Sequence, residues 1–586
     1  MGAFLLLRRN GFPRESPRAA RALKSLDLQG FSRSVELETR FWTVVTYRKL
    51  CGAESPIFRQ DSDNFLTYTG TLIHRRLSGT AVLESIFTEF DGTNFPWGEV
   101  FGAFCLILCR RGRLFVIPDR LGVYPVYGDA DEAIVSSSFV ALLESIDRPR
   151  TRTQSIYEYV IQGATYDDRT VIDQIHRLPR RSIFEFDDKI YRKEQQDVLW
   201  QGQKWTNVND HLALTANALR AQFAAIAKTF GNNIETALSG GYDSRLLLAL
   251  LRDRHISPRL HVYGGGLDPD VVVARKIAAG IRLPLSHIDK SDHKPPPPAE
   301  YPSVVLANMR ALDGCPPEGI FDNGADLLTR SQRARGGAVA LNGGGGEIFR
   351  NFYYLSDRPF TIEQLLWAFF SQFDRGIFTK AFSEERYLYN LSLAIAHVLR
   401  MPDDASLLQK TRLSRQHIEY LYPCFRCIYW MGRNNAINNR FGYEATPFIQ
   451  EGPVQIALQI PLRFKKHGSF EADLIELIDP TLAGFESAYG QTFSESPSIK
   501  RVIKDNLTVY RPIIARRLSH QIKSRFHNLV RFAPLTDGYL ASVLDTSFPY
   551  MGRYFRFERV KNAVDFNRIC TLEYLFQKNH VTPVDD

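Results

Sequence analysis

The sequence predicts two domains of different fold class: an α+β domain rich in strands, followed by an α/β domain with a parallel sheet. Three observations support this. A chain of 586 residues is too long for one hydrophobic core. Short apolar runs separated by turn residues occupy the first third. From about residue 208, strands alternate with helices and glycines follow the strands, as in parallel α/β sheets.

The first domain is expected over residues 1–190, followed by a polar linker over 191–207. Turn pairs such as Asp91-Gly92 and Arg111-Gly112 separate runs rich in Phe, Val, Ile and Leu. The expected strands are Ala3–Leu7, Phe41–Tyr47, Phe101–Cys109, Leu114–Ile117 and Ile183–Phe186.

The second domain is expected over residues 208–586. Apolar spacing predicts a helix from His211 to Phe230 that stops at Gly231. Two strand–helix units and a third, glycine-rich strand end follow: Ile234–Leu238 with Asp243–Asp253, Leu260–Tyr263 with Val271–Ile281, and Leu341–Gly346. The chain after Asp473 is helical by pattern. Ligands of such sheets bind beyond the carboxyl ends of the strands.

The composition is that of a soluble globular protein, with 44% hydrophobic and 23% charged residues. No apolar stretch reaches membrane-spanning length, and Met1–Leu7 is too short for a secretory signal. The odd count of seven cysteines suits a reducing compartment. We therefore expect a cytoplasmic protein with no membrane partner. Cys424 and Cys427 lack a second ligand pair, so buried helical cysteines are favoured over a zinc site.

The densest basic stretch includes Arg511, Arg516, Arg517, His520, Lys523 and Arg525. A solvated helix face is the favoured interpretation, and an acidic partner or nucleic acid is the alternative. No recognised nucleic-acid module accompanies the stretch, so we expect no nucleic-acid partner.

The loop between the strand ending at Leu238 and the next helix carries the strongest chemical signal. Its sequence is Ser239-Gly240-Gly241-Tyr242-Asp243-Ser244. A helix N-terminus directs free N–H groups at the loop, and the two glycines let the backbone approach an oxyanion. Asp243 would repel a bare phosphate, which suggests a bridging Mg²⁺. A simple capped turn would explain only one glycine and one capping residue.

This loop resembles the pyrophosphate-binding loop of the asparagine synthetase family, whose usual form is S-G-G-x-D-S. Five other segments resemble that family in its order: Ile117–Tyr127, Val171–Pro179, Asp270–Ala274, Leu341–Phe349 and Phe441–Phe448. The resemblance implies an N-terminal amidotransferase-like β-sandwich of the Ntn type, flanked by helices. It also implies a C-terminal PP-loop ATP-pyrophosphatase α/β domain with added helices.

The resemblance also implies site residues. ATP would contact Leu238, Ser239, Gly240, Gly241, Tyr242 and Ser244, with Gly264 and Gly344 in the neighbouring glycine loops. Asp243 and Glu347 would be catalytic and would bind Mg²⁺.

The first domain departs from the family where glutamine is hydrolysed. Glutamine-hydrolysing members use an N-terminal cysteine exposed by removal of Met1, whereas position 2 here is Gly2. The glutamine-holding N-G-E-I-Y-N is replaced by Thr69-Gly70-Thr71-Leu72-Ile73-His74. We therefore expect this domain to lack glutaminase activity.

The second domain departs at two points. The third loop usually has acids, as in S-G-E-G-S-D-E, but reads Leu341-Asn342-Gly343-Gly344-Gly345-Gly346-Glu347. If the loop is aligned forward from Leu341, Glu347 takes the place of the family's metal-facing Asp. If it is aligned backward from Phe349, Gly346 takes that place. The family's late lysine should fall near Tyr489–Phe493, where none is present, and Lys500 and Lys504 are nearby candidates.

The sequence therefore predicts an ATP-dependent amide-forming ligase. A small-molecule or peptide carboxylate would form an acyl-adenylate, and an amine or free ammonia would attack it. Relatives without glutaminase activity include β-lactam synthetases and the cyclases of lasso peptides. A glutamine-hydrolysing asparagine synthetase and a non-catalytic nucleotide-binding relative are the alternatives. The acid, the amine and the oligomeric state are not specified by the sequence.

Overall fold

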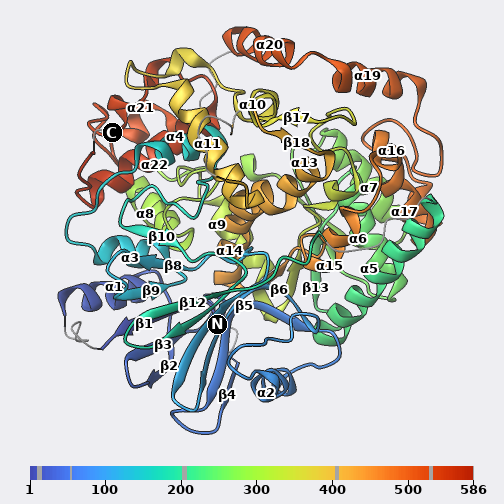
Figure 1. Cartoon of the computed structure of the whole chain (residues 1–586). Helices are drawn as coiled ribbons and strands as arrows, with labels where there is room; N and C mark the ends of the chain where they lie inside the picture. The colour runs from blue at the N-terminus through green and yellow to red at the C-terminus, as the bar shows by residue number, and fades with distance from the viewer. Residues whose placement is uncertain are drawn as a thin grey trace.

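The computed structural model describes residues 1–9, 16–52, 56–200, 207–402, 408, 410–526 and 532–584, without the side chains of 520–526. Its first part contains two six-stranded antiparallel sheets, and its second part contains a five-stranded parallel sheet (Figure 1). All five strands expected in the first domain are present, and β5 (Phe65–His74) is a central strand that the sequence did not predict.

The first sheet has the order β10-β8-β9-β1-β3-β2. These strands are Ile175–Arg177, Tyr127–Asp129, Ile134–Ser136, Ala3–Arg8, Trp42–Tyr47 and Arg33–Glu38. The second sheet has the order β12-β11-β7-β6-β5-β4. These strands are Ile190–Glu194, Ser182–Phe186, Arg113–Pro118, Val100–Arg110, Phe65–His74 and Ile57–Arg59.

The two antiparallel sheets pack face to face. Trp42 of the first sheet contacts Phe186 of the second, with ring centroids 4.9 Å apart. Helix α2 (Thr80–Glu89) covers the outer face of the second sheet, where a separate apolar cluster forms. Helices α1 (Pro17–Leu28) and α3 (Phe139–Ser145) pack together beside the first sheet. This is the helix-flanked sandwich that the resemblance implied; its assignment as an Ntn-type amidotransferase stays a prediction.

The parallel sheet has the order β15-β14-β13-β16-β19. These strands are Leu285–Ile288, Arg259–Tyr263, Ile234–Ala237, Val339–Leu341 and Tyr443–Ala445. Helices α5 (Val208–Phe230), α6 (Tyr242–Asp253) and α7 (Pro269–Gly280) are found where the apolar spacing predicted them. Strand β13 is central, so the loop that follows it opens at the middle of the sheet's carboxyl edge.

The remaining chain is helical and surrounds the parallel sheet. Helix α17 (Ser469–Ile478) packs on α6, and α14 (Gly432–Phe441) packs on β19 and β5. Cys424 and Cys427 are buried, as predicted, but in a π-helical segment (Tyr422–Met431). Among the described residues, no helix combines the length and the apolar character needed to cross a membrane.

The two halves are joined by a buried polar interface. The Lys49 ammonium donates to the carbonyls of Asn439 (2.6 Å) and Gly442 (2.7 Å). Burial lowers the pKa of Lys49 to about 7. The predicted division into domains at 190 and 208 is not tested by these contacts; residues 201–206 of the predicted linker lie outside the described part of the chain.

Candidate functional site: the loop after β13

The Ser239–Ser244 loop joins the end of β13 to the start of α6. Gly241 is the N-cap of α6 and no side chain caps this helix, so its first-turn N–H groups face the loop. The Ser239 N–H donates to the Ser244 hydroxyl over 3.0 Å, and the two serine hydroxyls are also 3.0 Å apart. Backbone donors and two hydroxyls therefore surround one point at the positive end of α6, an arrangement suited to an anion.

Gly240 is held so tightly that a side chain does not fit. A Cβ at this position would lie 2.6 Å from the Cβ of Ala488. The Gly240 N–H donates to Asp270 Oδ1 (2.8 Å), and its carbonyl accepts from the Ala488 N–H (3.0 Å). Gly241 is more open, since a Cβ there would meet only the Ser239 hydroxyl at 3.5 Å.

Asp243 lies in an ion-pair cluster that the sequence did not reveal. Arg350 Nη2 is 2.6 Å from Asp243 Oδ1, and Arg350 Nε is 2.8 Å from Glu471 Oε2. Glu347 Oε1 lies 3.8 Å from the same guanidinium. Asp243 and Arg350 are mostly buried, and Glu471 is completely buried. The guanidinium of Arg350 therefore lies within 4 Å of three carboxyl groups near the start of α6.

Burial dominates the protonation of this cluster. Burial raises the pKa of Asp243 to about 6, while the Arg350 charge opposes the rise. Burial, together with the neighbouring Asp243 charge, raises the pKa of Glu471 well above its usual value. Burial acts to lower the pKa of Arg350, but the charges of Asp243, Glu471 and Glu347 outweigh it and raise that pKa. Arg350 therefore stays charged and holds the cluster together.

The third glycine loop brings Gly346, and not Glu347, directly against Asp243. A Cβ at Gly346 would lie 2.6 Å from Asp243 Oδ1 and 2.9 Å from Glu471 Oε1. Glu347 Oε2 instead accepts from the Tyr422 hydroxyl (2.7 Å) and the Gly345 N–H (3.0 Å). The geometry agrees with the alignment in which Gly346 replaces the family's metal-facing Asp.

The other residues that the sequence predicted to contact the nucleotide differ in how accessible they are to a ligand. Leu238 is buried behind the loop. The ring of Tyr242 stacks on Phe493 with centroids 4.1 Å apart, so only its backbone can face a ligand. Gly264 ends β14 with a φ of +128°, which favours glycine. Gly344 donates its N–H to Asn342 Oδ1 (2.8 Å), so that group is already engaged.

The predicted Mg²⁺ site does not fit the residues as they are arranged. Carboxylate oxygens are suitable Mg²⁺ ligands. However, Asp243 is engaged by Arg350, and Glu347 is engaged by Tyr422. No group of three or more His, Cys, Asp or Glu residues that could hold a metal ion occurs in the described ranges. Arg350 thus occupies the position that a bridging cation would take between the acids.

The segment expected to carry the family's lysine packs on the loop without one. The Arg501 guanidinium lies over the rings of Tyr242 (5.2 Å) and Tyr489 (4.6 Å). Lys500 and Lys504, the two candidates from sequence, are exposed on the outer side of α19 (Ile499–Tyr510). Arg501 is thus the cation that this helix directs at the site. The apolar spacing of the helix could not have predicted this orientation, because its aliphatic stripe faces outward.

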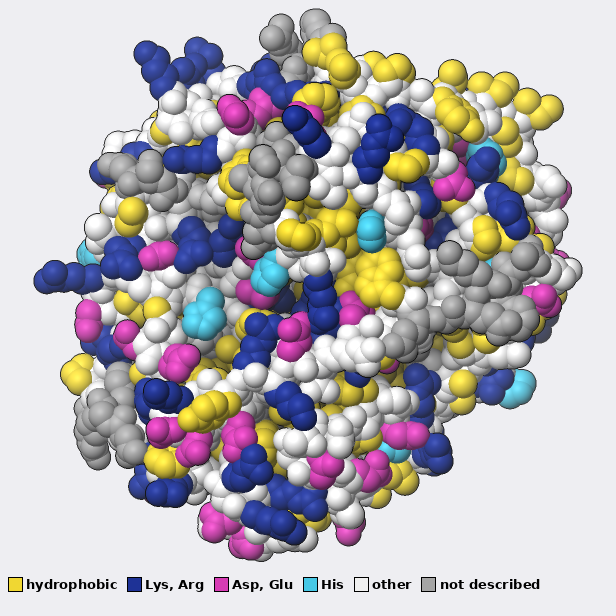
Figure 2. Space-filling model, viewed as in Figure 1, with side chains coloured by type: hydrophobic (Ala, Val, Ile, Leu, Met, Phe, Trp, Pro, Cys, Tyr) yellow, Lys and Arg dark blue, Asp and Glu magenta, His cyan; other side chains and the backbone are white. Residues whose placement is uncertain are grey.

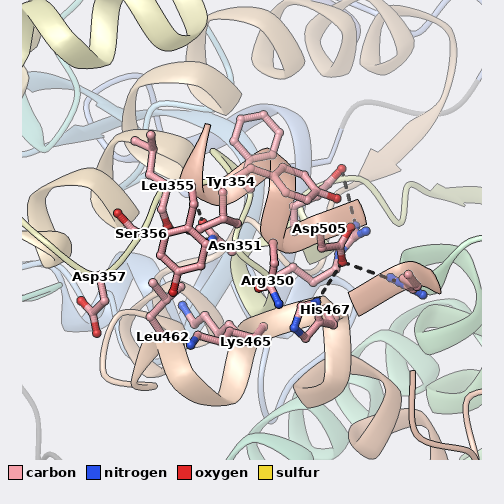
Figure 3. Close-up of a pocket in the computed structure, with 18 of the residues that line it drawn as sticks. Arg350, Asn351, Tyr354, Leu355, Ser356, Asp357, Leu462, Lys465, His467 and Asp505 are labelled. Atoms are coloured by element: carbon pink, nitrogen blue, oxygen red, sulfur yellow. Dashed lines mark hydrogen bonds and ion pairs between the residues drawn. The ribbon is translucent and has the colours of Figure 1, made fainter. Parts of the chain in front are cut away.

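A cavity of about 580 Å³ opens beside the Asp243 cluster (Figure 3). Glu347 and Arg350 form its inner end, and α19 contributes Arg501 and Asp505. Aromatic and aliphatic side chains line its middle, and Lys465 lies in the wall with its ammonium 2.8 Å from Glu419 Oε2. Its volume suits an organic acid or a short peptide segment.

A second cavity of about 250 Å³ lies at the carboxyl ends of β13, β14 and β16. Ala237, Tyr263 and Asn342 line it at the strand ends. His261 and Glu235 lie deeper, with His261 Nδ1 3.3 Å from Glu235 Oε1. This cavity borders the same strand end as the loop, which is the usual position of a ligand in a parallel α/β sheet.

Position 2, where glutamine-hydrolysing members of the resembled family carry their cysteine, has no room for a side chain in this structure. A Cβ at Gly2 would lie 2.7 Å from the Arg48 carbonyl oxygen and 2.8 Å from Lys49 Cα. Thr71, in the segment that replaces the glutamine-holding motif, donates to Asn439 Oδ1 (2.7 Å). That segment therefore forms part of the interface with the second half.

Comparison with known proteins gives a distant similarity. No protein-family model matches the chain. A protein from Methanocaldococcus jannaschii, provisionally named glutamine-hydrolysing asparagine synthetase 2, is 25% identical over 175 residues. The match covers 28% of this chain and 33% of the relative. At this coarse level, the chain is similar to asparagine synthetases.

Two solved structures are also similar over about half of the chain. One is glutamine phosphoribosylpyrophosphate amidotransferase from B. subtilis complexed with ADP and GMP, at 12% identity and a TM-score of 0.22; it covers 49% of this chain and 65% of that chain. The other is described as the allosteric regulatory enzyme of purine biosynthesis, at 11% identity and a TM-score of 0.24; it covers 50% of this chain and 81% of that chain.

Proposed function

We propose that the protein is an ATP-dependent ligase that activates a carboxylate as an acyl-adenylate and passes it to an amine, without hydrolysing glutamine. The observation that carries the proposal is the Ser239–Ser244 loop, which lies at the N-terminus of α6 and at the carboxyl edge of a parallel sheet. Its backbone N–H groups and two hydroxyls suit the pyrophosphate that leaves when a carboxylate attacks the α-phosphate.

The two cavities beside the loop support this assignment. The smaller cavity borders the end of β13 and suits a nucleoside, with the aromatic ring of Tyr263 in its lining. The larger cavity begins at Glu347 and Arg350 and suits the acid substrate. The smaller cavity reaches Ala237 at the end of β13, and the larger one reaches Arg350, which pairs with Asp243. An acid in the larger cavity could therefore lie close to an α-phosphate held at the loop.

Arg350 is the residue we assign to charge stabilisation. Its guanidinium is permanently charged and lies at the inner end of the acid cavity. It can steady the pyrophosphate, because a fixed cation needs no reorganisation during the reaction. ATP carries Mg²⁺ on its own phosphates, where the ion neutralises charge with few protein ligands. Asp243 offers that ion no free carboxylate, since it is engaged by Arg350.

A non-catalytic nucleotide-binding role is the second candidate. The observation that favours it is the same ion pair, because Asp243 is unavailable while it contacts Arg350. Such a protein would bind ATP but release no pyrophosphate with any acid. A glutamine-hydrolysing synthetase receives no support from Gly2, whose surroundings exclude a side chain.

Pyrophosphate release from ATP tests the proposal. The purified full chain is assayed with a panel of amino acids, dicarboxylic acids and short peptides, each with ammonia or a primary amine. We expect acid-dependent release that falls at least about 100-fold in Asp243→Asn, because the Asp243 carboxylate holds Arg350 beside the loop. Asp253→Asn, at the far end of the same helix, is the matched control and should retain activity. Equal acid-dependent release in wild type and Asp243→Asn would overturn the assignment of the loop.

A further inference from the structure

The helices α19 and α20 (Ile513–Phe526) carry an unusual concentration of exposed aliphatic side chains. Ile499, Leu507 and Tyr510 are 80%, 70% and 67% exposed. Ile503, Ile514 and Leu518 are each more than half exposed. Figure 2 shows hydrophobic side chains gathered at the upper right, where Figure 1 places α19, and some at the top, where it places α20. Single exposed apolar residues are ordinary, but a continuous group usually marks an interaction surface.

The exposed side chains of α19 form one stripe. At about 100° per residue, Ile499, Ile503, Leu507 and Tyr510 fall within an arc of about 80°. Ile514 and Leu518 continue the apolar group on α20. The stripe does not face the core, because none of the α19 residues is fully buried.

The same segment carries nearly all of the protein's net charge. Residues 496–536 contain nine Lys and Arg and one Asp, a net charge of +8, whereas the whole chain has +9. Lys500, Lys504 and Arg511 are exposed, and all three flank the stripe on one side. The side chains of His520, Lys523 and Arg525, which belong to the basic stretch seen in the sequence, lie outside the described part of the structure.

Two charged residues on the inner side of α19 contact the rest of the protein. Asp505, the one acid of the segment, pairs with His467 at 3.1 Å (Figure 3). Arg501 packs over Tyr489 at the edge of the 580 Å³ cavity. The acid is thus used inside the protein, and the exposed side chains of α19 are cations and apolar residues, apart from Thr508. A solvated helix face, the interpretation favoured by sequence, does not explain the aliphatic stripe.

We propose that the outer face of α19 and α20 binds an anionic lipid surface and attaches the protein peripherally to it. A helix with aliphatic residues on one side and Lys or Arg beside them lies in the plane of a bilayer, with its apolar side among the acyl chains. The cations add attraction to anionic headgroups. The sequence led us to expect no membrane partner, because such a surface leaves no spanning segment to detect.

Vesicle flotation tests this proposal with the full chain. Wild type should float with phosphatidylcholine vesicles that contain phosphatidylserine, less at high salt, and should stay in solution with phosphatidylcholine alone. The double substitution Ile503→Glu and Leu507→Glu should weaken binding at least about 10-fold. Both positions are exposed, so folding should be unaffected.

Two further variants distinguish binding by this surface from non-specific hydrophobic adsorption to vesicles. Leu267→Glu changes a side chain that is 93% exposed elsewhere in the chain, and it should bind vesicles like wild type. Lys500→Glu with Lys504→Glu should reduce binding to the anionic vesicles at least about 10-fold. The proposal is overturned if wild type does not float with anionic vesicles, whether or not it binds an acidic protein. Equal flotation of Ile503→Glu/Leu507→Glu and wild type would also overturn it.

Discussion

Replacing Arg350 with Met is the perturbation that most sharply probes the Asp243 cluster. Arg350 contacts Asp243 at 2.6 Å and Glu471 at 2.8 Å, in a site that is mostly buried. Two charges about 4 Å apart attract by about 4 kcal/mol at an effective dielectric constant of about 20. Desolvation of the guanidinium offsets part of this gain. Removing one partner of a buried pair typically costs about 3–5 kcal/mol, which is the loss in unfolding free energy we expect.

A double-mutant cycle measured by chemical denaturation tests this value. Asp243→Asn combined with Arg350→Met should be less destabilising than the two single losses added together, because the remaining Asn carries no unpaired charge. Arg33→Met is the control: its pair with Asp27 is exposed, so the expected loss is below about 1 kcal/mol. Arg350 does not hold the cluster together if the unfolding free energy of Arg350→Met lies within about 1 kcal/mol of that of wild type. The same conclusion follows if the two single losses add up to the loss in the double variant.

Three other predictions concern the loop and the interface. Gly240→Ala should lower pyrophosphate release at least about 10-fold, because the added methyl group collides with Ala488 and shifts the loop. Gly241→Ala, where there is more space, should have a much smaller effect on release. Similar losses of release in the two variants would contradict this explanation. Gly2→Cys should lower the melting temperature and create no glutaminase activity; ammonia release from glutamine by this variant would contradict the packing argument. Lys49 has a folded-state pKa of about 7, against an ordinary lysine pKa of 10.5, so the unfolded chain binds the extra proton between these values. Wild-type stability should therefore rise by about 1.4 kcal/mol per pH unit, relative to Lys49→Met, as the pH increases through that range; parallel stability curves would contradict it.

The order of strands and helices around the loop could be predicted because local patterns determine it. The apolar run Ile234–Leu238, the two glycines and the following helix all indicate the same strand–turn–helix unit. Strand β5 was missed, since its central Thr-Gly-Thr breaks the apolar run; tertiary pairing with β6 stabilises it.

The partners of Asp243 could not be predicted, because they come from segments far apart in the sequence. Glu471 lies in an apolar helix and Arg350 follows the third glycine loop, with nothing local to connect them. The uncertain alignment of Gly346 and Glu347 also needed three-dimensional contacts, since both alignments satisfy the sequence pattern. The basic stretch was visible, but burial was needed to show that its aliphatic residues face outward.

A crystal structure with α,β-methylene-ATP tests the central claim most directly, because it needs no knowledge of the acid or the amine. We expect the β- and γ-phosphates to accept hydrogen bonds from Ser239, Ser244 and the first-turn N–H groups of α6. We expect the base to lie in the cavity lined by Ala237 and Tyr263. Phosphates bound away from this loop, or no nucleotide bound at all, would contradict the proposed function of the loop.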